Sequence, residues 1–406
     1  MLSHFFSKNS LENNKIDIPQ IVITEVGQWK YFGWFILGFY LLQREGLVKL
    51  KFRLPLIYYL LIVCSSSSIT RFIGVIIQFF YGVGSYNLKG YIEYESGLKC
   101  RSFTIDCADS PFSFDGDALE KTFVYFKMQC PKRLDTDGFP IIKSVILPWI
   151  DHSKSRKINH DIFHKLFLAN RYKIKPLMVG PRRLGYGLSY KELIRGYQNI
   201  ISSRKLQKRQ KFMCYFGNSK GPVATYVKNG ELNLNSESQL MGFLGERASH
   251  PNEKRYIVSD MLKKFDKSDA RLITLGNSDS RNGSRINASI PLKDFYSHVA
   301  NFEYNLNISG YRLSIPNRFI ESFAVGTAVV TDNLLLRWYQ PFSKYEVIET
   351  VDMGYEKVEN VDFESFEFYL QNLPHSIPEN IVADFEKKWQ PIEVAKYLIQ
   401  STIGNR

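Results

Sequence analysis

Residues 302–345 read FEYNLNISGYRLSIPNRFIESFAVGTAVVTDNLLLRWYQPFSKY, and this stretch decides the expected fold. Its apolar pattern predicts a buried strand, a helix and a second strand in that order, at 304–308, 317–324 and 327–330. Gly326 is placed to end the helix, because glycine readily adopts the left-handed conformation common at helix C-termini. A strand, a loop, a helix and a second strand form half of a nucleotide-binding α/β unit.

Charged residues in this stretch lie where such a unit binds phosphate. The free amides and the dipole at the start of the expected helix favour an anion. Arg312 and Arg318 supply two further donors for a diphosphate. Glu321, one turn further on, is placed to accept hydrogen bonds from ribose hydroxyls. The stretch therefore predicts a nucleotide site, and the alternative is an ordinary doubly wound domain with a salt-bridged arginine.

The same stretch resembles the donor-binding segment of glycosyltransferases with two Rossmann-like domains, the GT-B architecture. It is most similar to the capsule-associated and protein O-glucosyltransferase family. The shared features are an aromatic-rich strand, an Ile-x-Gly turn, a Ser-x-x-x-Arg step and a Trp-Tyr pair, carried by Phe302, Tyr304, Asn305, Ile308, Gly310, Ser314, Arg318, Trp338 and Tyr339. Exostosin-like families show a related pattern, matched by Tyr311, Arg312, Glu321 and Gly326. Residues 215–262 match more loosely, and 315–317 depart from the family pattern.

The resemblance implies a donor site for a sugar nucleotide in the second half of the chain. A glycine turn at 217–221 is expected to face the donor, and two arginines on or before a helix at 252–264 are expected beside the diphosphate. For those two arginines the alternative is a charged helix surface. The full set of expected donor-binding residues is Gly217, Asn218, Lys220, Arg247, Arg255, Gly276, Arg312, Ser314, Arg318 and Glu321.

The general base is expected at the end of an earlier strand. The strand predicted at 102–107 delivers Asp106 and Asp109 to its carboxyl end, where α/β proteins bind ligands. Sugar transfer with inversion needs a carboxylate to deprotonate the acceptor hydroxyl, and Asp109 is the preferred candidate over Asp106 and Asp115. A helix cap or a turn is the alternative role for these aspartates.

No metal or other cofactor is expected. The resemblance implies that arginine, lysine and a helix dipole balance the leaving diphosphate, and the acidic stretch at 277–283 contains no Asp-x-Asp. His160 and His164 are spaced like two zinc ligands, but the acid between them is Asp161 rather than the glutamate of zinc proteases, and no third ligand is evident.

Length allows one large or two medium domains and the pattern predicts an α/β fold, and the GT-B resemblance implies two Rossmann-like domains that face a cleft. A chain of 406 residues exceeds the size at which one core usually divides. A strand, helix and strand at 20–25, 31–44 and 47–54 open the first domain. The resemblance implies an acceptor domain at 1–205, a donor domain at 206–380 and a terminal part at 381–406. A helix predicted at 378–403 is expected to cross back to the first domain, as terminal helices of GT-B enzymes commonly do.

Charge and hydrophobicity point to the partners. Residues 151–211 hold 16 Lys or Arg and three acids, a net +13 that equals the formal charge of the whole chain. This basic segment suits a diphosphate carrier, anionic lipid or a solvated helical face, and no nucleic-acid-binding motif accompanies it. Apolar runs at 31–42 and 54–83 are too short or too interrupted to span a bilayer, which needs about 20 residues. They predict buried helices, or a shallow insertion into the inner leaflet.

Together these patterns predict a cytoplasmic hexosyl- or pentosyltransferase, peripheral at the inner membrane. Five cysteines and no apolar leader at 1–17 favour a reducing compartment. The expected donor is a UDP-sugar, and the expected acceptor is a surface polysaccharide, such as capsule or lipopolysaccharide, or a lipid-linked glycan. The alternatives are a non-catalytic, membrane-associated glycan-binding or scaffold protein, and a transferase that uses GDP-fucose or a CMP-linked acidic sugar.

Overall fold

The computed structural model describes most of the chain. The described residues are 18–64, 66–81, 86–94, 100–108, 114–132, 134, 160–182, 184, 187–204, 211–220, 254–255, 257–275, 290, 292–308, 314–332, 334, 336–349, 361–374 and 380–404.

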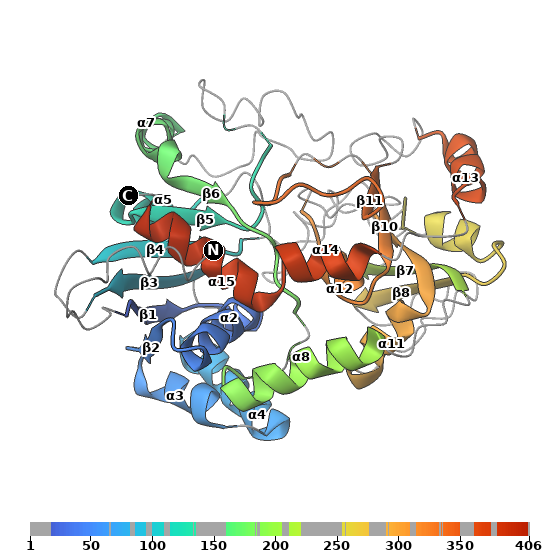
Figure 1. Cartoon of the computed structure of the whole chain (residues 1–406). Coiled ribbons are helices and arrows are strands. Elements are labelled where there is room, and N and C mark those ends of the chain that lie inside the picture. The colour runs from blue at the N-terminus through green and yellow to red at the C-terminus, as the bar shows by residue number, and fades with distance from the viewer. Residues whose placement is uncertain are drawn as a thin grey trace, which may run out of the picture.

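Two β-sheets with helices packed around them organise this part of the chain, so the predicted α/β class is confirmed (Figure 1). The strands of the first sheet are β1 (Gln20–Val26), β2 (Lys49–Phe52), β3 (Asn87–Glu93), β4 (Arg101–Asp106), β5 (Val124–Lys127) and β6 (Ile174–Pro176). Those of the second are β7 (Lys211–Lys220), β8 (Asp269–Leu275), β9 (Phe302–Asn307), β10 (Ala328–Thr331) and β11 (Val347–Glu349).

Helices connect the strands and cover the sheets. In the first half of the chain they are η1 (Trp29–Tyr31), α2 (Gly33–Arg44), α3 (Leu56–Val63), α4 (Ser67–Tyr81), α5 (Gly116–Lys121), α7 (His160–Asn170), η2 (Arg171–Lys173) and α8 (Tyr190–Arg204). In the second half they are α11 (Leu292–Ala300), α12 (Arg318–Ala324), α13 (Phe363–Gln371), α14 (Asn380–Lys388) and α15 (Pro391–Ile403). Residues 254–255 and 257–262 are also helical, within the helix predicted at 252–264. None of the described helices is long and apolar enough to cross a membrane.

The first sheet has the order β2-β1-β3-β4-β5-β6. β1 and β2 are parallel and joined by α2, which confirms the predicted strand-helix-strand opening. β3 runs antiparallel to both of its neighbours, whereas the other paired strands are parallel. This strand was not predicted. Its direction is not contained in the sequence pattern, because alternation of apolar residues indicates a strand but not the way it runs.

The second sheet has the order β11-β10-β9-β7-β8, and its described pairs are all parallel. β7, the first of these strands along the chain, therefore lies inside the sheet, with β8 on one side and β9 on the other. This is a doubly wound order, in which ligands bind beyond the carboxyl ends of the two strands where the winding reverses. That point lies between β7 and β9.

The glycine turn predicted at 217–221 is wrong for residues 217–220. These residues continue β7, with Gly217 paired to Leu272 and Lys220 paired to Leu275 of β8. Pairing with β8 satisfies the backbone donors and acceptors of the segment, and this outweighs the turn preference of glycine and asparagine. Gly221 lies outside the described residues.

The predicted single terminal helix is two helices, α14 and α15. The backbone N–H of Trp389 still donates to the carbonyl of Phe385 (2.8 Å), but α15 begins anew at Pro391. Proline has no N–H and its ring collides with the preceding helical turn, so it is tolerated at the start of a helix and not in its interior. Residues 378–379 of the predicted helix lie outside the described residues.

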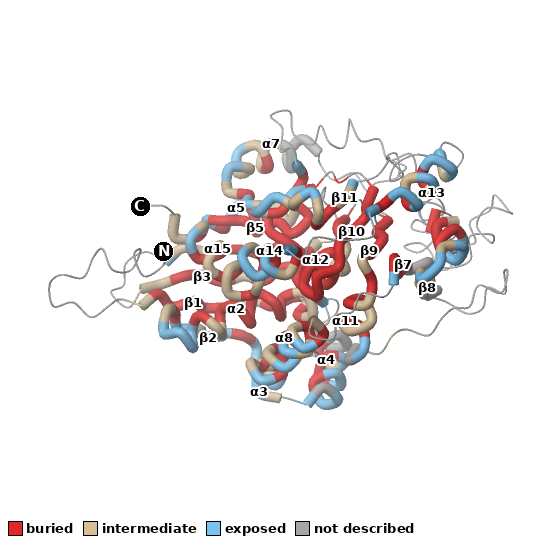
Figure 2. Tube along the Cα trace, turned by 45° about the vertical axis from the view of Figure 1, so that its right-hand side comes forward, coloured by how far each residue is buried: buried red, intermediate tan, exposed pale blue. Residues whose placement is uncertain are grey.

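The C-terminal helices join the two sheets. α15 packs on α2 and reaches β3 and β4 of the first sheet. The indole N–H of Trp34 on α2 donates to the carbonyl of Trp389 (3.0 Å), and the hydroxyl of Tyr397 on α15 donates to the carbonyl of Pro176 (2.9 Å). Buried residues from both sheets form one large continuous core, and Figure 2 draws all buried residues in red.

Candidate functional site

The loops that follow the carboxyl ends of strands in the two sheets meet at one junction. Cys130, just past β5, accepts a hydrogen bond from the backbone N–H of Arg337 (2.9 Å), past β10. Pro131 and Leu336 form a β-bridge beside this contact. Because parallel strands present ligand-binding loops at their carboxyl ends, this junction is the candidate functional site.

Gln129 holds the segment that leads into α12. Its side-chain amide donates to the carbonyl of Ile315 (2.9 Å) and accepts from the backbone N–H of the same residue (2.9 Å). All of these groups are buried, and they join the end of β5 to the loop after β9. The position of the segment that precedes Arg318 is therefore set by the first sheet.

The loop after β6 makes two further contacts with the start of α12. The side-chain amide of Asn317 donates to the carbonyl of Gly180 and so leaves α12 without a side-chain cap. The backbone N–H of Arg182 donates to Oε1 of Glu321 (3.2 Å), whose side chain is buried. One carboxylate oxygen of Glu321 is thus engaged by the first half of the chain, and its predicted contact with ribose stays a prediction.

α12 is fastened to β9 by a short chain of hydrogen bonds. The amide of Asn305 donates to the hydroxyl of Ser322 (2.7 Å), which donates to the carbonyl of Arg318 (2.7 Å). The Arg318 side chain is half-buried, and its positive charge acts on Cys214 of β7. Burial and the charge of Asp269 raise the pKa of that thiol well above its usual value, and Arg318 opposes the shift. Arg318 therefore lies within electrostatic reach of β7, next to the reversal point of the sheet.

Polar residues close the carboxyl ends of β9 and β10. The amide of Asn307 donates to the hydroxyl of Thr331 (3.1 Å), and this hydroxyl donates to Asp332 (3.3 Å). All three side chains are buried. Oδ1 of Asn307 has no hydrogen-bond partner among the described residues, so it leaves a buried acceptor at the strand end where a ligand would bind.

Asp106 lies in a buried ion pair at the end of β4. Its Oδ2 accepts from the ammonium of Lys127 (2.7 Å) and from the hydroxyl of Tyr125 (2.6 Å), and its Oδ1 accepts from the backbone N–H of Ala108 (2.7 Å). Burial, with the charge and hydrogen bond of Asp106, raises the pKa of Tyr125 well above its usual range, so the phenol keeps its proton. Both oxygens of Asp106 are engaged, and a catalytic role for it stays a prediction.

The other predicted site residues are only partly placed by the described structure. Ser314 is buried directly before Ile315, and Arg255 is buried on its helix rather than on a charged surface. Gly217, Asn218 and Lys220 lie in β7. The remaining predicted residues lie outside the described residues: Asp109, Arg247, Gly276 and Arg312.

Sequence reasoning missed several residues of the junction. Gln129 follows β5, Asn307 ends β9 and Asp332 follows β10, and a polar residue at a strand end was the available signal. Asp115, the third acid weighed as a base, caps α5 by accepting from the backbone N–H of Ala118 (3.0 Å), which agrees with the alternative role considered for the aspartates. Among the described side chains, no group of three or more His, Cys, Asp or Glu is arranged to hold a metal ion.

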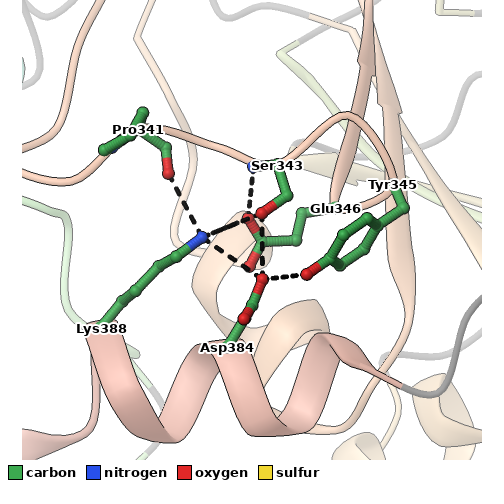
Figure 3. Close-up of polar contacts among 6 residues, drawn as sticks. All are labelled: Pro341, Ser343, Tyr345, Glu346, Asp384 and Lys388. Atoms are coloured by element: carbon green, nitrogen blue, oxygen red, sulfur yellow. Dashed lines mark hydrogen bonds and ion pairs between the residues drawn. The ribbon is translucent and has the colours of Figure 1, made fainter.

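A separate polar cluster lies at the amino end of β11 in the second sheet (Figure 3). The ammonium of Lys388 contacts Glu346 (3.1 Å), Ser343 (3.0 Å) and Asp384 (3.5 Å). Burial raises the pKa of Glu346, and hydrogen bonds from Ser343 and Lys388 offset only part of that rise. Glu346 directly precedes β11, so this cluster anchors α14 at the amino ends of the strands, away from the candidate site.

The fold and its junction define a class: an α/β protein with two sheets, the second doubly wound, whose strand-end loops meet. No protein-family model matches the chain, and no curated protein matches it. Among solved structures, the crystal structure of Anabaena Alr3699/HepE in complex with UDP and glucose aligns over 95% of this chain and 99% of its own, with 8% sequence identity and a TM-score of 0.32. This degree of similarity supports no conclusion, so the family resemblance of residues 302–345 stays a prediction.

Proposed function

We propose that the protein is a glycosyltransferase that moves a hexosyl or pentosyl group from a nucleotide donor, a UDP-sugar, to a surface polysaccharide or lipid-linked glycan. The observation that carries the proposal is the position of residues 314–321. They follow β9 at the reversal point of a doubly wound sheet and are held there by the first sheet through Gln129, Gly180 and Arg182.

In this proposal the donor lies beyond the carboxyl ends of β7 and β9. Arg318 binds the diphosphate together with three basic residues expected nearby, Lys220, Arg247 and Arg312. Glu321 is the proposed acceptor of hydrogen bonds from ribose, and Asn307 offers an acceptor to the donor. Positive side chains stabilise the leaving diphosphate, so the reaction needs no metal ion. The acceptor approaches from the first sheet, where Asp109 is the proposed base.

Nucleotide binding tests the proposal first. Thermal unfolding of the full chain is measured with UDP, GDP, CMP and ADP in the absence of added metal. A ligand that binds only the folded state stabilises it by about 2.7 kcal/mol at a hundredfold excess over its Kd. A selective shift with UDP is the expected result. A selective shift with GDP or CMP identifies the alternative donor classes, and no shift with any nucleotide contradicts the proposed donor site.

One observation favours a non-catalytic glycan-binding protein as the second candidate. Both oxygens of Asp106 are occupied by hydrogen bonds, which leaves Asp109 as the acid on which transfer depends. The Asp109→Asn variant separates the two candidates. Loss of transfer with unchanged nucleotide binding supports the enzyme, whereas nucleotide binding without detectable transfer in the wild-type protein supports the binding protein.

A further inference from the structure

Helices α3 and α4 form a hairpin at one edge of the molecule, beside α8 (Figures 1 and 2). Its inner face is fixed to the body of the protein. Leu61 of α3 is fully buried and accepts from the backbone N–H of Leu188 (2.7 Å). On α4, the buried hydroxyl of Thr70 donates to Glu192 of α8 (3.5 Å), and Ile73 lies in the core. The hairpin is therefore a defined part of the fold.

The outer face of the hairpin is apolar and exposed. Both helices carry a second apolar stripe at helical spacing, made of Leu56, Leu60, Val63, Ile69, Phe72 and Val75. Leu56 is 85% exposed, Val63 76% and Phe72 67%. Six large apolar side chains on two adjacent helices are more than the isolated exposed residues that most protein surfaces tolerate. A helix that is apolar on all sides needs an apolar surrounding on both faces.

The charged residues within this segment of the chain are all positive. Residues 46–88 contain no Asp or Glu, and their four cations are exposed: Lys49, Lys51, Arg53 and Arg71. Three of these cations lie in or directly after the edge strand β2, which precedes α3: Lys49, Lys51 and Arg53. A second cationic group lies at α4, where Arg71 and Arg182 are close enough to Lys30 to add to the effect of burial and lower the pKa of Lys30.

We propose that the outer face of the α3–α4 hairpin inserts into the surface of a bilayer that contains anionic lipid. An exposed apolar stripe flanked by cations and free of acids is complementary to acyl chains beneath negatively charged headgroups. A protein partner would be expected to meet acidic as well as basic groups at the rim of its interface. The insertion is shallow, because neither helix is long enough to span the hydrocarbon core.

The hairpin is linked to the candidate site through one loop. Arg182 belongs to the cationic group at α4, and its backbone N–H contacts Glu321 of α12. The loop after β6 therefore runs from the side of the molecule that would face the bilayer to the junction of the two sheets. The inference extends the peripheral location predicted for the proposed transferase, and it is tested separately from nucleotide binding.

Flotation of the full chain with vesicles tests the inference. Vesicles of phosphatidylcholine alone are compared with vesicles that also contain phosphatidylglycerol. We expect the wild-type protein to float with the anionic vesicles, and added salt to weaken that binding. The double variant Val63→Ser/Phe72→Ser is expected to bind the anionic vesicles at least roughly tenfold more weakly than the wild type, because two inserted apolar side chains are lost.

A matched control uses apolar residues of equal exposure elsewhere. The variant Tyr172→Ser/Phe368→Ser removes side chains that are 72% and 69% exposed, and it is expected to float like the wild type. The inference is overturned if the wild type does not bind anionic vesicles, or if Val63→Ser/Phe72→Ser binds them as well as the wild type does. Self-association that the same variant abolishes, without vesicle binding, would identify an interface between copies and also overturn it. A cooperative thermal unfolding transition, measured without ligand, shows that both variants remain folded. Nucleotide-induced stabilisation reports separately on the proposed function.

Discussion

The side-chain amide of Gln129 pairs with the backbone N–H and C=O of Ile315, 186 positions away, through two buried hydrogen bonds of 2.9 Å, as a neighbouring strand would. One residue comes from the end of β5 in the first sheet, and the other lies between β9 and α12 in the second. The pair therefore couples the two sheets at the point where the candidate site is built. Since Ile315 lies three residues before Arg318, this contact also positions the first turn of α12.

Replacing Gln129 with methionine should lower the stability of the protein. The N–H and C=O of Ile315 would stay buried without partners, at a cost of about 1–3 kcal/mol for each group. We expect the free energy of unfolding in denaturant to fall by about 2–4 kcal/mol, and nucleotide binding to weaken as the segment before Arg318 loosens. Gln371→Met, on an exposed surface of α13, is the control and should change stability by less than about 0.5 kcal/mol. Equal stability of the two variants would contradict the coupling role.

The buried pair of Asp106 and Lys127 should be strongly interdependent. Lys127→Met leaves a carboxylate buried without its cation, which costs about 3–5 kcal/mol. The double variant Asp106→Asn/Lys127→Met removes both charges and should lose less stability than the sum of the two single variants. A double-mutant cycle by chemical denaturation measures this difference. Additive losses would show that the two groups act independently, despite their distance of 2.7 Å.

Substitution of Arg318 should weaken binding of the proposed nucleotide donor and leave the protein folded. A charged hydrogen bond contributes about 1.5–3 kcal/mol, so Arg318→Ala should raise the Kd for UDP by roughly tenfold to a hundredfold. Arg318→Lys keeps the charge but loses the planar pair of donors, and it should fall between the wild type and the alanine variant. Titration calorimetry provides the measurement, with thermal unfolding as the check on folding. Unchanged UDP affinity in folded Arg318→Ala would remove Arg318 from the donor site.

The cluster in Figure 3 predicts a pH-dependent stability. Burial raises the pKa of Glu346, so its ionised form is disfavoured in the folded state, and Lys388 offsets part of that effect. In Lys388→Met this offset is gone, and the pKa of Glu346 should rise further. An acid whose pKa is raised in the folded state lowers the free energy of unfolding at pH values above that pKa. Below the pKa of the unfolded state it has no such effect, because the acid is protonated in both states. Lys388→Met should therefore lose about 2–4 kcal/mol near neutral pH.

The double variant Lys388→Met/Glu346→Gln isolates the glutamate. It should be more stable than Lys388→Met at neutral pH, because the buried ionised carboxylate is absent. The difference should disappear as the pH falls below the usual range of a glutamate, since Glu346 is then protonated in both states. Unfolding free energies of the two variants across this pH range provide the measurement. A difference that does not vary with pH would contradict the raised pKa as its cause.

Elements with a strong local pattern were predicted from the sequence. The strand, helix and strand of residues 302–331 and the strand-helix-strand opening are present, and Gly326 has φ 84°, a conformation in which glycine is favoured. Two predictions failed where longer-range pairing or a single residue decided the structure. β8 holds residues 217–220 in a strand against their turn preference, and Pro391 divides the terminal helix.

The order of apolar, basic and turn-forming residues by itself determined the α/β class, most strand positions and the place of Arg318 at the start of α12. Local pattern carries this information, because backbone geometry sets the period of each element. Only the tertiary structure decided the strand order 8-7-9-10-11, the reversed direction of β3, and the meeting of Gln129 with Ile315. It also decided that one apolar stripe of the α3–α4 hairpin is buried while the other faces outward. These outcomes depend on contacts between residues far apart in the chain, and a local sequence pattern does not contain them.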